Sequence, residues 1–219
     1  MMNSRRVVIT GLGALSSLGN DVKSSWQNAK EGRSGAVAIS YFNTEKFKTQ
    51  FASELKNWDP TLRLDRNDIK RSDLYTQYGL YVAAEAMDDA GLDVSQLESP
   101  FDGGVIWGTS QGGMGTFEKE MKEFVGNELN PRFNPFFIPK YLVNMASGVI
   151  SMKYGFMGIN YTPVTACASS NSAIMDAFNY IKWGKAKVII TGGSEAPITE
   201  AAMGGFNALK ALSTRNENP

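Results

Sequence analysis

Short apolar segments alternate along this chain with segments whose apolar residues recur at helical spacing. The clearest apolar segments are residues 7–10, 104–108 and 187–191, and glycine or another small residue follows each of them. Strands that are apolar throughout are typical of parallel sheets with helices packed on both faces. The alternation therefore predicts a layered α/β fold with a largely parallel sheet.

Capping residues and glycines mark where the helices of this pattern should begin and end. Asn20-Asp21 can cap a helix that reaches about residue 30, and Ser72 is placed to cap a longer helix that Gly91 ends. Pro139 suits the first turn of a helix that continues to Gly155. Further helices are expected after the glycine loop at residues 111–115, after residue 167 and around residues 203–206, whereas residues 33–70 should be irregular with a short strand near residue 51.

The only cysteine of the chain, Cys167, lies where an expected strand turns directly into an expected helix. Residues 161–165 favour extended backbone, and apolar residues recur at helical spacing after Cys167 up to Gly184. Unpaired N–H groups and the helix dipole stabilise a thiolate at such a position. The small neighbours Ala166 and Ala168 leave the sulfur accessible. The pattern indicates a nucleophile, and the alternative is a buried structural cysteine.

The chain contains no histidine, although a cysteine nucleophile usually works with a base within hydrogen-bond reach, most often an imidazole. Lys153, Lys182 and Glu195 are conceivable substitutes, but none has motif spacing around Cys167. Either the sulfur is not catalytic or its partners lie on polypeptide outside this chain. The polar segment 211–219, which has no closing strand or helix, favours the second alternative.

The composition fits a folded protein and excludes several classes of function. Hydrophobic residues make up 42% of the 219 residues, which is enough for a buried core. Acidic and basic residues balance at 22 each, so there is no overall basic field for nucleic acid. One cysteine and no histidine leave no disulfide framework and no usual zinc site. We therefore expect no metal site of this kind and a reducing, cytoplasmic location. No apolar stretch is long enough for a membrane span.

Two glycine-rich loops resemble nucleotide-binding loops only in part. In the first, Gly11-Leu-Gly13, Ser16 stands where a dinucleotide-binding loop has its third glycine, and no helix begins at once. The second, at residues 111–115, lacks the Lys-Ser/Thr ending of a phosphate-binding loop. We therefore expect no dinucleotide site at the first loop and a close-packing backbone turn at the second.

Three motifs carry a family resemblance. They are Val164-Thr-Ala-Cys167-Ala-Ser169, Gly192-Gly-Ser-Glu-Ala196 and Gly204-Gly-Phe206-x-Ala-x-x-Ala-Leu-Ser-Thr-Arg215-Asn-x-Asn-Pro219. Together they resemble the β-ketoacyl-acyl-carrier-protein synthases of the thiolase-like condensing-enzyme superfamily, in particular the elongating synthase II type. The resemblance covers residues 1–219 but only about the first half of the family's length. It implies a thiolase-like, layered α-β-α fold with a mixed, largely parallel sheet, built from two pseudo-duplicated halves.

This chain would then be the first, nucleophile-bearing half, and the absent second half would supply two catalytic histidines and a lysine. Cys167 would accept an acyl group from acyl carrier protein, malonyl-carrier protein would lose CO₂, and the resulting carbanion would attack the acyl-enzyme. The Cys167 N–H would form half of an oxyanion hole, which fits a helix start. This decarboxylative Claisen condensation elongates acyl chains in fatty-acid or polyketide and polyene biosynthesis, without a cofactor. The chain alone should be inactive, because the histidine bases are missing.

By the same resemblance, Gln111 lines the acyl pocket and Phe206 is an aromatic residue beside the active site. Many elongating synthases are apolar at the position of Gln111, and an amide inside a lipid tunnel needs hydrogen bonds. This departure favours a shorter or polyunsaturated, polyketide-like chain over an ordinary long saturated one. The alternative is that Gln111 points into a dimer interface or contacts a water.

The resemblance also implies two kinds of protein partner. The family is homodimeric, and the strand at residues 161–165 lies at its two-fold interface. An acidic acyl carrier protein docks on basic residues of related synthases, although Asn67 and Pro131 stand where relatives often carry a base. The bases present at or beside those positions are Arg66, Lys70, Arg71, Arg132 and Lys210.

Two other classes of function stay open. Some relatives of the family are non-catalytic partner subunits that set chain length, and they lack the nucleophilic cysteine, so Cys167 argues against that role. A lone half would act as an interaction fragment rather than as an enzyme. A cysteine hydrolase of unrelated fold shares the strand-to-helix bend but predicts none of the other motifs.

Overall fold

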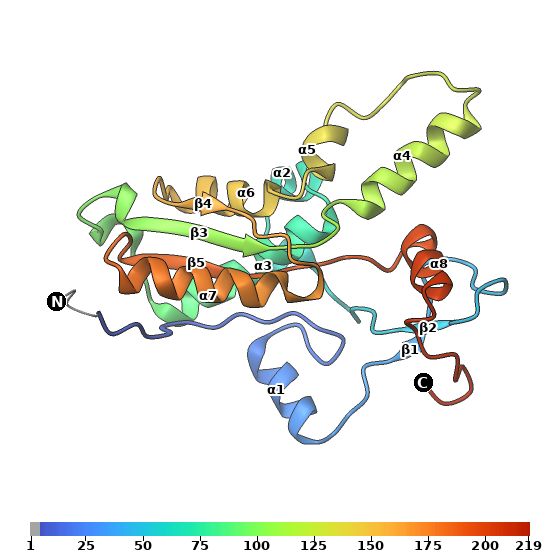
Figure 1. The fold of residues 1–219 in the computed structure, drawn as a ribbon, viewed down its shortest axis with the longest axis horizontal. Coiled ribbons are helices and arrows are strands. Elements are labelled where there is room, and N and C mark those ends of the chain that lie inside the picture. The colour runs from blue at the N-terminus through green and yellow to red at the C-terminus, as the bar shows by residue number, and fades with distance from the viewer. Residues whose placement is uncertain (1–4) are drawn as a thin grey trace.

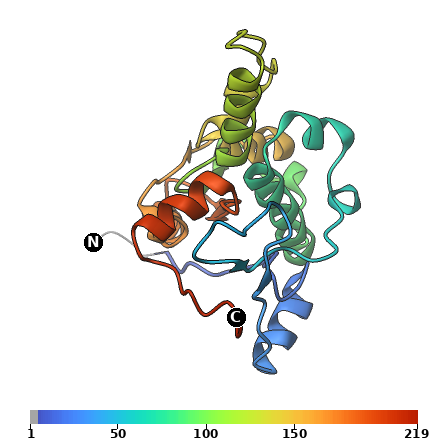
Figure 2. The same cartoon turned by 90° about the vertical axis from the view of Figure 1, so that its right-hand side faces the viewer.

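The computed structural model describes residues 5–219 (Figure 1; Figure 2). Its helices are α1 (Val22–Lys30), α2 (Arg66–Arg71), α3 (Leu74–Ala90), α4 (Met114–Gly126), α5 (Phe137–Tyr141), α6 (Met145–Tyr154), α7 (Ser169–Lys182) and α8 (Glu200–Ala208). Its strands are β1 (Val37–Ala38), β2 (Phe51–Ala52), β3 (Gly103–Gly108), β4 (Asn160–Tyr161) and β5 (Val188–Gly193). A short 3-10 helix, Ala166–Ala168, directly precedes α7.

The central sheet has three strands in the order β4-β3-β5, and both pairings are parallel. β3 is the middle strand, and every one of its residues is buried. The register pairs Val105 with Ile190 and, at the ends of β3 and β5, Gly108 with Gly193. β1 and β2 form a separate antiparallel pair. The predicted parallel sheet is thus confirmed.

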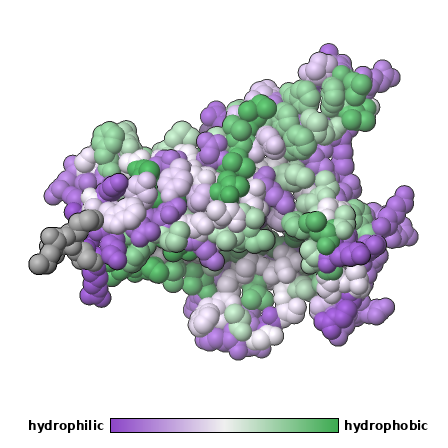
Figure 3. Space-filling view, in the orientation of Figure 1, coloured by the Kyte–Doolittle hydropathy of each residue, from purple (hydrophilic) through white to green (hydrophobic). Residues whose placement is uncertain are grey.

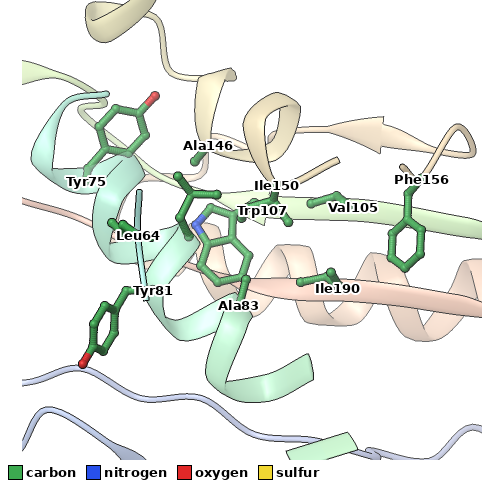
Figure 4. Close-up of a cluster of buried hydrophobic side chains, with 11 residues drawn as sticks. Leu64, Tyr75, Tyr81, Ala83, Val105, Trp107, Ala146, Ile150, Phe156 and Ile190 are labelled. Atoms are coloured by element: carbon green, nitrogen blue, oxygen red, sulfur yellow. The ribbon is translucent and has the colours of Figure 1, made fainter. Parts of the chain in front are cut away.

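Residues of β3 alternate between the two faces of the sheet, as strand geometry requires. Val105 and Trp107 belong to a buried cluster with residues of α3 and α6, among them Ala83 and Ile150 (Figure 4). Ile106 belongs to a second cluster with residues of α7. Helices therefore cover both faces of the sheet, which is the layered arrangement that the alternating sequence predicts (Figure 1).

The segment that precedes α1 packs closely against α3. A Cβ atom at Gly11 would lie 2.0 Å from the carbonyl oxygen of Ala86, and one at Gly13 would lie 1.9 Å from that of Val82. Only glycine allows the two backbones to come this close. This contact accounts for the Gly-x-Gly motif without a bound dinucleotide.

The prediction of a strand at residues 7–10 is wrong. These residues join no sheet, and the side chains of Val8 and Ile9 are 56% and 81% exposed. The backbone just after them is bound by a carboxylate of α3, because the Leu12 N–H donates to Asp89 at 2.9 Å. An apolar run favours extended backbone, but a strand also needs a partner edge. No strand within residues 5–219 pairs with this segment.

Two of the predicted helix boundaries are confirmed and one is wrong. Asp21 caps α1, and Gly91 ends α3 with a φ of 57°. Asp73 rather than Ser72 caps α3, since its carboxylate accepts the Tyr75 N–H at 3.1 Å. Ser72 instead ends α2, the short helix just before. Both residue types are favourable caps, so the sequence alone does not separate two adjacent candidates.

Two further elements are shorter than expected. The helix predicted over residues 139–155 is split into α5 and α6, because the backbone at Leu142 is extended. The strand before residue 167 is limited to β4, which covers Asn160–Tyr161. Residues 33–70 are largely irregular, as predicted, with β2 at the expected place and α2 at the end.

An arm formed by α4, residues 127–136 and α5 projects from the body of the molecule (Figure 1). Stacked rings hold it together: the ring centres of Phe133 and Phe137 lie 5.3 Å apart. Apolar areas lie among polar ones on the surface of the arm (Figure 3), and the side chains of Val125, Leu129 and Ile138 are each more than half exposed. These three apolar side chains are therefore largely exposed and are not packed within the arm.

Candidate active site

A cavity of about 300 Å³ lies where the sheet meets the start of α7. Its wall is formed by the ends of β3 and β5, by the loops that follow these strands and by the turn Ala166–Ala168. Cys167, Gln111 and Phe206 all contribute to it, although they come from distant parts of the chain. The structure thus brings the three residues singled out in the sequence around one space.

Cys167 lies in a sharp turn between β4 and α7. Ala166 before it has a φ of 51°, a left-handed conformation that costs a non-glycine residue about 1–2 kcal/mol. The buried Ser169 holds the turn closed, because its hydroxyl donates to the Ala166 carbonyl at 2.7 Å and accepts the Thr165 N–H at 2.9 Å. Cys167 itself is exposed. Within the described residues this exposure argues against the alternative of a buried structural cysteine.

Two glycines at the ends of β3 and β5 let the start of α7 approach the sheet. A Cβ atom at Gly108 would lie 2.4 Å from the carbonyl oxygen of Ser169, and one at Gly193 would lie 2.7 Å from the Cβ of Ser170. Any larger residue would push the first turn of α7 away from the sheet. Gly108 and Gly193 therefore help to set the position of Cys167, because their lack of a Cβ atom allows α7 to begin close to the sheet.

The carboxylate of Glu195 fastens the loop after β3 to the loop after β5. One oxygen accepts the hydroxyl of Thr109 and the N–H of Ser110, the latter at 2.7 Å, and the other accepts the Ser110 hydroxyl at 3.0 Å. The Gln111 N–H also faces this carboxylate, at 3.4 Å. Hydrogen bonds to an ionised carboxylate are among the stronger ones in proteins. These contacts indicate that Glu195 positions the wall and does not act as the base.

The two lysines considered as substitute bases do not line the cavity. Lys153 forms an ion pair with Asp68 at 2.5 Å. Lys182 is the last residue of α7, whose first residue follows the turn that holds Cys167. A helix of this length separates the two ends by roughly 20 Å. Neither lysine therefore lies where it could act as a base for Cys167.

The side chain of Gln111 ends in an atom without a partner. Its Oε1 is buried but accepts no hydrogen bond within residues 5–219. The loop behind it is tight: Gly112 has a φ of 60°, and a Cβ atom at Gly113 would lie 2.1 Å from the carbonyl oxygen of Lys140. The predicted close-packing turn at residues 111–115 is confirmed, and it holds Gln111 at a fixed place in the wall.

The basic residues expected to bind a carrier protein are exposed and lie on three parts of the chain. They are Arg66, Lys70 and Arg71 on α2, Arg132 between α4 and α5, and Lys210 just after α8. The Arg71 guanidinium lies 5.6 Å from the ring centre of Phe136, so α2 adjoins the loop that carries Arg132. Lys210 follows α8, which is tied to α4 by an ion pair of Glu200 with Lys122. Among the ion pairs of residues 5–219, none involves these five bases.

Most of the residues that position Cys167 could not be identified from the sequence. Gly108 could have been identified, since a glycine at the end of a strand indicates that another backbone segment approaches closely. Ser169 could not, because a serine at a helix start ordinarily caps that helix, whereas this hydroxyl bonds back to the preceding turn. Glu195 was considered only as a base, and its bonds to a loop more than 80 residues away could not be foreseen.

No three His, Cys, Asp or Glu side chains of residues 5–219 converge in a way that could hold a metal ion. In the same residues, no helix combines the length and the apolar character needed to cross a membrane.

Comparison with solved structures gives the class of this fold. The chain superposes with a TM-score of 0.88 on a structure described as the ishigamide ketosynthase/chain length factor, to which it is 27% identical. The match covers 96% of this chain and 52% of that one. The layered α/β arrangement with its parallel sheet is therefore the thiolase-like fold of ketosynthases.

Residues 4–219 match the family described as Beta-ketoacyl synthase, N-terminal domain, and the chain belongs to this family. It is 42% identical to 3-oxoacyl-(acyl-carrier-protein) synthase 2 of Staphylococcus aureus (strain COL), over 99% of this chain and 52% of that protein. The protein of the same name from Coxiella burnetii (strain RSA 493 / Nine Mile phase I) is 41% identical, over 100% of this chain and 52% of that protein. The chain spans about half the length of the curated relatives it matches.

Proposed function

We propose that residues 1–219 form the nucleophile-bearing half of a condensing enzyme that elongates acyl chains, and that a second half supplies the bases. The main support is Cys167, which is exposed on a strained turn in the wall of a cavity that Gln111 and Phe206 also line. The relatives are named as synthases of 3-oxoacyl-acyl-carrier-protein. Their reaction needs such a nucleophile beside a space for an acyl chain.

The reaction proceeds in two steps. In the first, the Cys167 thiolate attacks the thioester carbonyl of acyl carrier protein, a new C–S bond forms, and the carrier thiol leaves with a proton. In the second, malonyl-carrier protein loses CO₂, and the resulting carbanion attacks the carbonyl of the acyl-Cys167 thioester. The C–S bond to Cys167 then breaks, which releases the elongated 3-oxoacyl carrier protein and restores the thiolate.

The chain itself supplies the position of the nucleophile and part of the charge stabilisation. Within residues 5–219, no backbone hydrogen bond engages the Cys167 N–H. N–H groups at a helix start have no partner inside the helix, and a donor of this kind can stabilise the oxyanion of the tetrahedral intermediate. Phe206 adds an apolar surface to the cavity where the acyl chain begins.

The proposal includes two protein partners. Acyl carrier protein would dock on the exposed bases of α2 together with Arg132 and Lys210. A second copy of the chain would pair through residues 161–165, where Val164 is 52% exposed. We place the protein in the cytoplasm, because an exposed free thiol suits a reducing compartment.

A second candidate function is that of a partner subunit that sets chain length through protein–protein contact. It stays open because the solved structure matched at 27% identity is described as a ketosynthase together with a chain length factor. Cys167 favours the catalytic role, since a non-catalytic subunit has no use for an exposed thiol on a strained turn beside a cavity.

Acyl transfer to Cys167 tests the proposal in the complete protein that contains this chain. After incubation with acyl-loaded carrier protein, the intact mass should rise by one acyl group per chain. The Cys167→Ala variant should gain none. A complete protein that binds carrier protein but never gains this mass would be a partner subunit instead, and the proposed catalytic role would be wrong.

A further inference from the structure

One side chain, that of Ser169, closes the turn before α7. Its hydroxyl donates to the Ala166 carbonyl at 2.7 Å and accepts the Thr165 N–H at 2.9 Å. The Ser169 N–H donates to the same Ala166 carbonyl. Ser169 is only 4% exposed, so its hydroxyl serves these partners rather than solvent. A single serine therefore binds the backbone of the two residues directly before Cys167.

The backbone that these bonds hold is strained. Ala166 has a φ of 51°, and this left-handed conformation costs a non-glycine residue free energy of the order that one or two hydrogen bonds contribute. The two bonds of the Ser169 hydroxyl therefore suffice to offset the strain, and without them Ala166 would favour a negative φ. A rotation at Ala166 would turn the peptide group that follows it, which carries the Cys167 N–H.

We propose that Ser169 is a positioning residue, whose hydroxyl keeps the Cys167 N–H directed at the oxyanion that forms when the thiolate attacks a thioester. The inference rests on the proposed function, because it requires acyl transfer to Cys167. Cys167 lines the cavity, and no backbone carbonyl of residues 5–219 accepts its N–H. As the C–S bond forms, an electron pair of the thioester carbonyl moves onto its oxygen. A donor already in place stabilises this charge without reorganisation.

Helix capping does not account for these contacts. A capping side chain accepts an N–H from two or three positions further along its helix, whereas the Ser169 hydroxyl bonds backward to residues that precede α7. A second serine of α7, Ser172, also reaches Thr165, but its bond joins the two hydroxyls at 2.8 Å and is exposed. Of these two serines, only Ser169 holds the backbone of the turn.

The test compares two reactions of the same thiol in the complete protein that contains this chain. Acyl transfer from loaded carrier protein passes through an oxyanion, whereas alkylation by iodoacetamide displaces iodide and forms none. Ser169→Ala should slow single-turnover acylation of Cys167 by about tenfold to a hundredfold. The carrier concentration that gives half the maximal rate and the rate of alkylation should both stay close to those of wild type. Ser169→Thr keeps the hydroxyl and should retain most of the acylation rate.

A second substitution separates positioning from a direct contact with substrate. Glycine adopts a positive φ without the steric cost that alanine meets. Ala166→Gly, added to Ser169→Ala, should therefore recover part of the lost acylation rate. Ser169 also lines the cavity, and a hydroxyl that acted on the substrate directly would not be replaced in this way. If Ser169→Ala alone proves unfolded by thermal denaturation, the double variant should still fold and be acylated.

The matched control is Ser172→Ala. It removes the exposed bond to the same threonine, and Ser172 does not line the cavity. Its acylation and alkylation rates should equal those of wild type. A loss of acylation as large as that of Ser169→Ala would show that general loosening of this turn, and not the contacts of Ser169, governs the reaction.

The outcomes separate the inference from the proposed function. A selective loss of acylation in Ser169→Ala that Ala166→Gly partly reverses supports the inference. Unchanged acylation, equal losses of acylation and alkylation, or a folded double variant that recovers nothing overturns it, while acyl transfer to Cys167 in the wild type still stands. If the wild-type protein is never acylated at Cys167, the proposed function is wrong and the inference falls with it.

Discussion

The carboxylate of Glu195 accepts the N–H of Ser110 at 2.7 Å, across a separation of 85 positions in the sequence. With the hydroxyls of Thr109 and Ser110, this bond joins the loops that follow the two longest strands of the sheet. The cavity wall beside Cys167 is therefore held by a residue that we assign no part in bond making or breaking.

Replacing Glu195 with alanine should lower the free energy of unfolding by about 2–3 kcal/mol, because the Ser110 N–H and two hydroxyls lose their acceptor. Glu195→Gln should cost less, since its amide oxygen can still accept the Ser110 N–H. Urea unfolding with comparable m-values measures both effects. An alanine variant as stable as the wild type would mean that other contacts hold the loop.

Gly108→Ala should destabilise the protein by about 3 kcal/mol, because the added methyl group overpacks the start of α7. The clash is with the Ser169 carbonyl oxygen at 2.4 Å, so the turn that holds Cys167 should shift and alkylation of Cys167 by iodoacetamide should change in rate. Gly148→Ala is the control, since no atom lies within 4 Å of a Cβ atom at this position in α6. It should be neutral or stabilising by up to about 1 kcal/mol. Similar losses of unfolding free energy in both variants would show that Gly108 is not needed for the close approach of α7 to the sheet.

The cap of α1 should make stability depend on pH. The Ser24 N–H donates to Asp21 at 2.6 Å and lowers the pKa of this carboxyl from its ordinary value of 3.8. Because the folded pKa lies below the unfolded one, the stabilisation is present above the unfolded pKa and is lost as the pH falls through the folded pKa. Asp21→Ala should therefore cost about 1 kcal/mol at neutral pH.

Measured by urea unfolding, the difference between wild type and Asp21→Ala should shrink as the pH falls below about 4. Asp21→Asn keeps a capping oxygen without the charge, so its stability relative to Asp21→Ala should not vary with pH in this range. A difference between wild type and the alanine variant that stays constant down to the lowest pH would show that the carboxylate charge contributes nothing.

Reversing the charges of Lys70, Arg71 and Lys210 to glutamate should raise the KM for an acyl-carrier substrate by about tenfold at low salt. Reaction with a small thioester mimic should stay nearly unchanged, because the substituted side chains are exposed and do not line the cavity. The difference should decrease as ionic strength rises, since salt screens exposed charges. Initial rates at several salt concentrations provide the measurement.

A charge-matched control distinguishes a docking surface from an effect of net charge. Reversal of three other exposed lysines changes the net charge equally on a different part of the chain; these are Lys23, Lys30 and Lys46. The control should leave the KM for the carrier substrate unchanged. Equal effects of both triple variants, or an equal loss with the small thioester, would disprove the docking assignment.

The parallel sheet could be predicted from the sequence because a strand that is buried on both faces is apolar at successive positions. Val105, Ile106 and Trp107 are apolar in succession, and the structure buries all three in the middle strand of the sheet. Residues 7–10 contain a similar apolar run but form no strand. Strand formation depends on a partner edge that the local sequence does not encode, and this is why the two segments differ.

The site could be predicted only in outline. Small residues around Cys167 indicated the turn, but nothing in an alanine marks the left-handed φ of Ala166. Family resemblance, not spacing, pointed to Gln111 and Phe206. The bonds of Glu195 to the loop after β3 join residues far apart in the sequence, and a single sequence carries no record of such a pair.

The central sheet has two open edges within residues 5–219, because β4 and β5 each pair only with β3. Unpaired backbone donors and acceptors along a strand template the addition of other strands, and the exposed side chains of Val8 and Ile9 offer apolar surface as well. Residues 1–219 produced by themselves should consequently aggregate as concentration and temperature rise. Production together with a polypeptide that covers these edges should give a more soluble and longer-lived sample, so the open edges determine how this protein is best purified and stored.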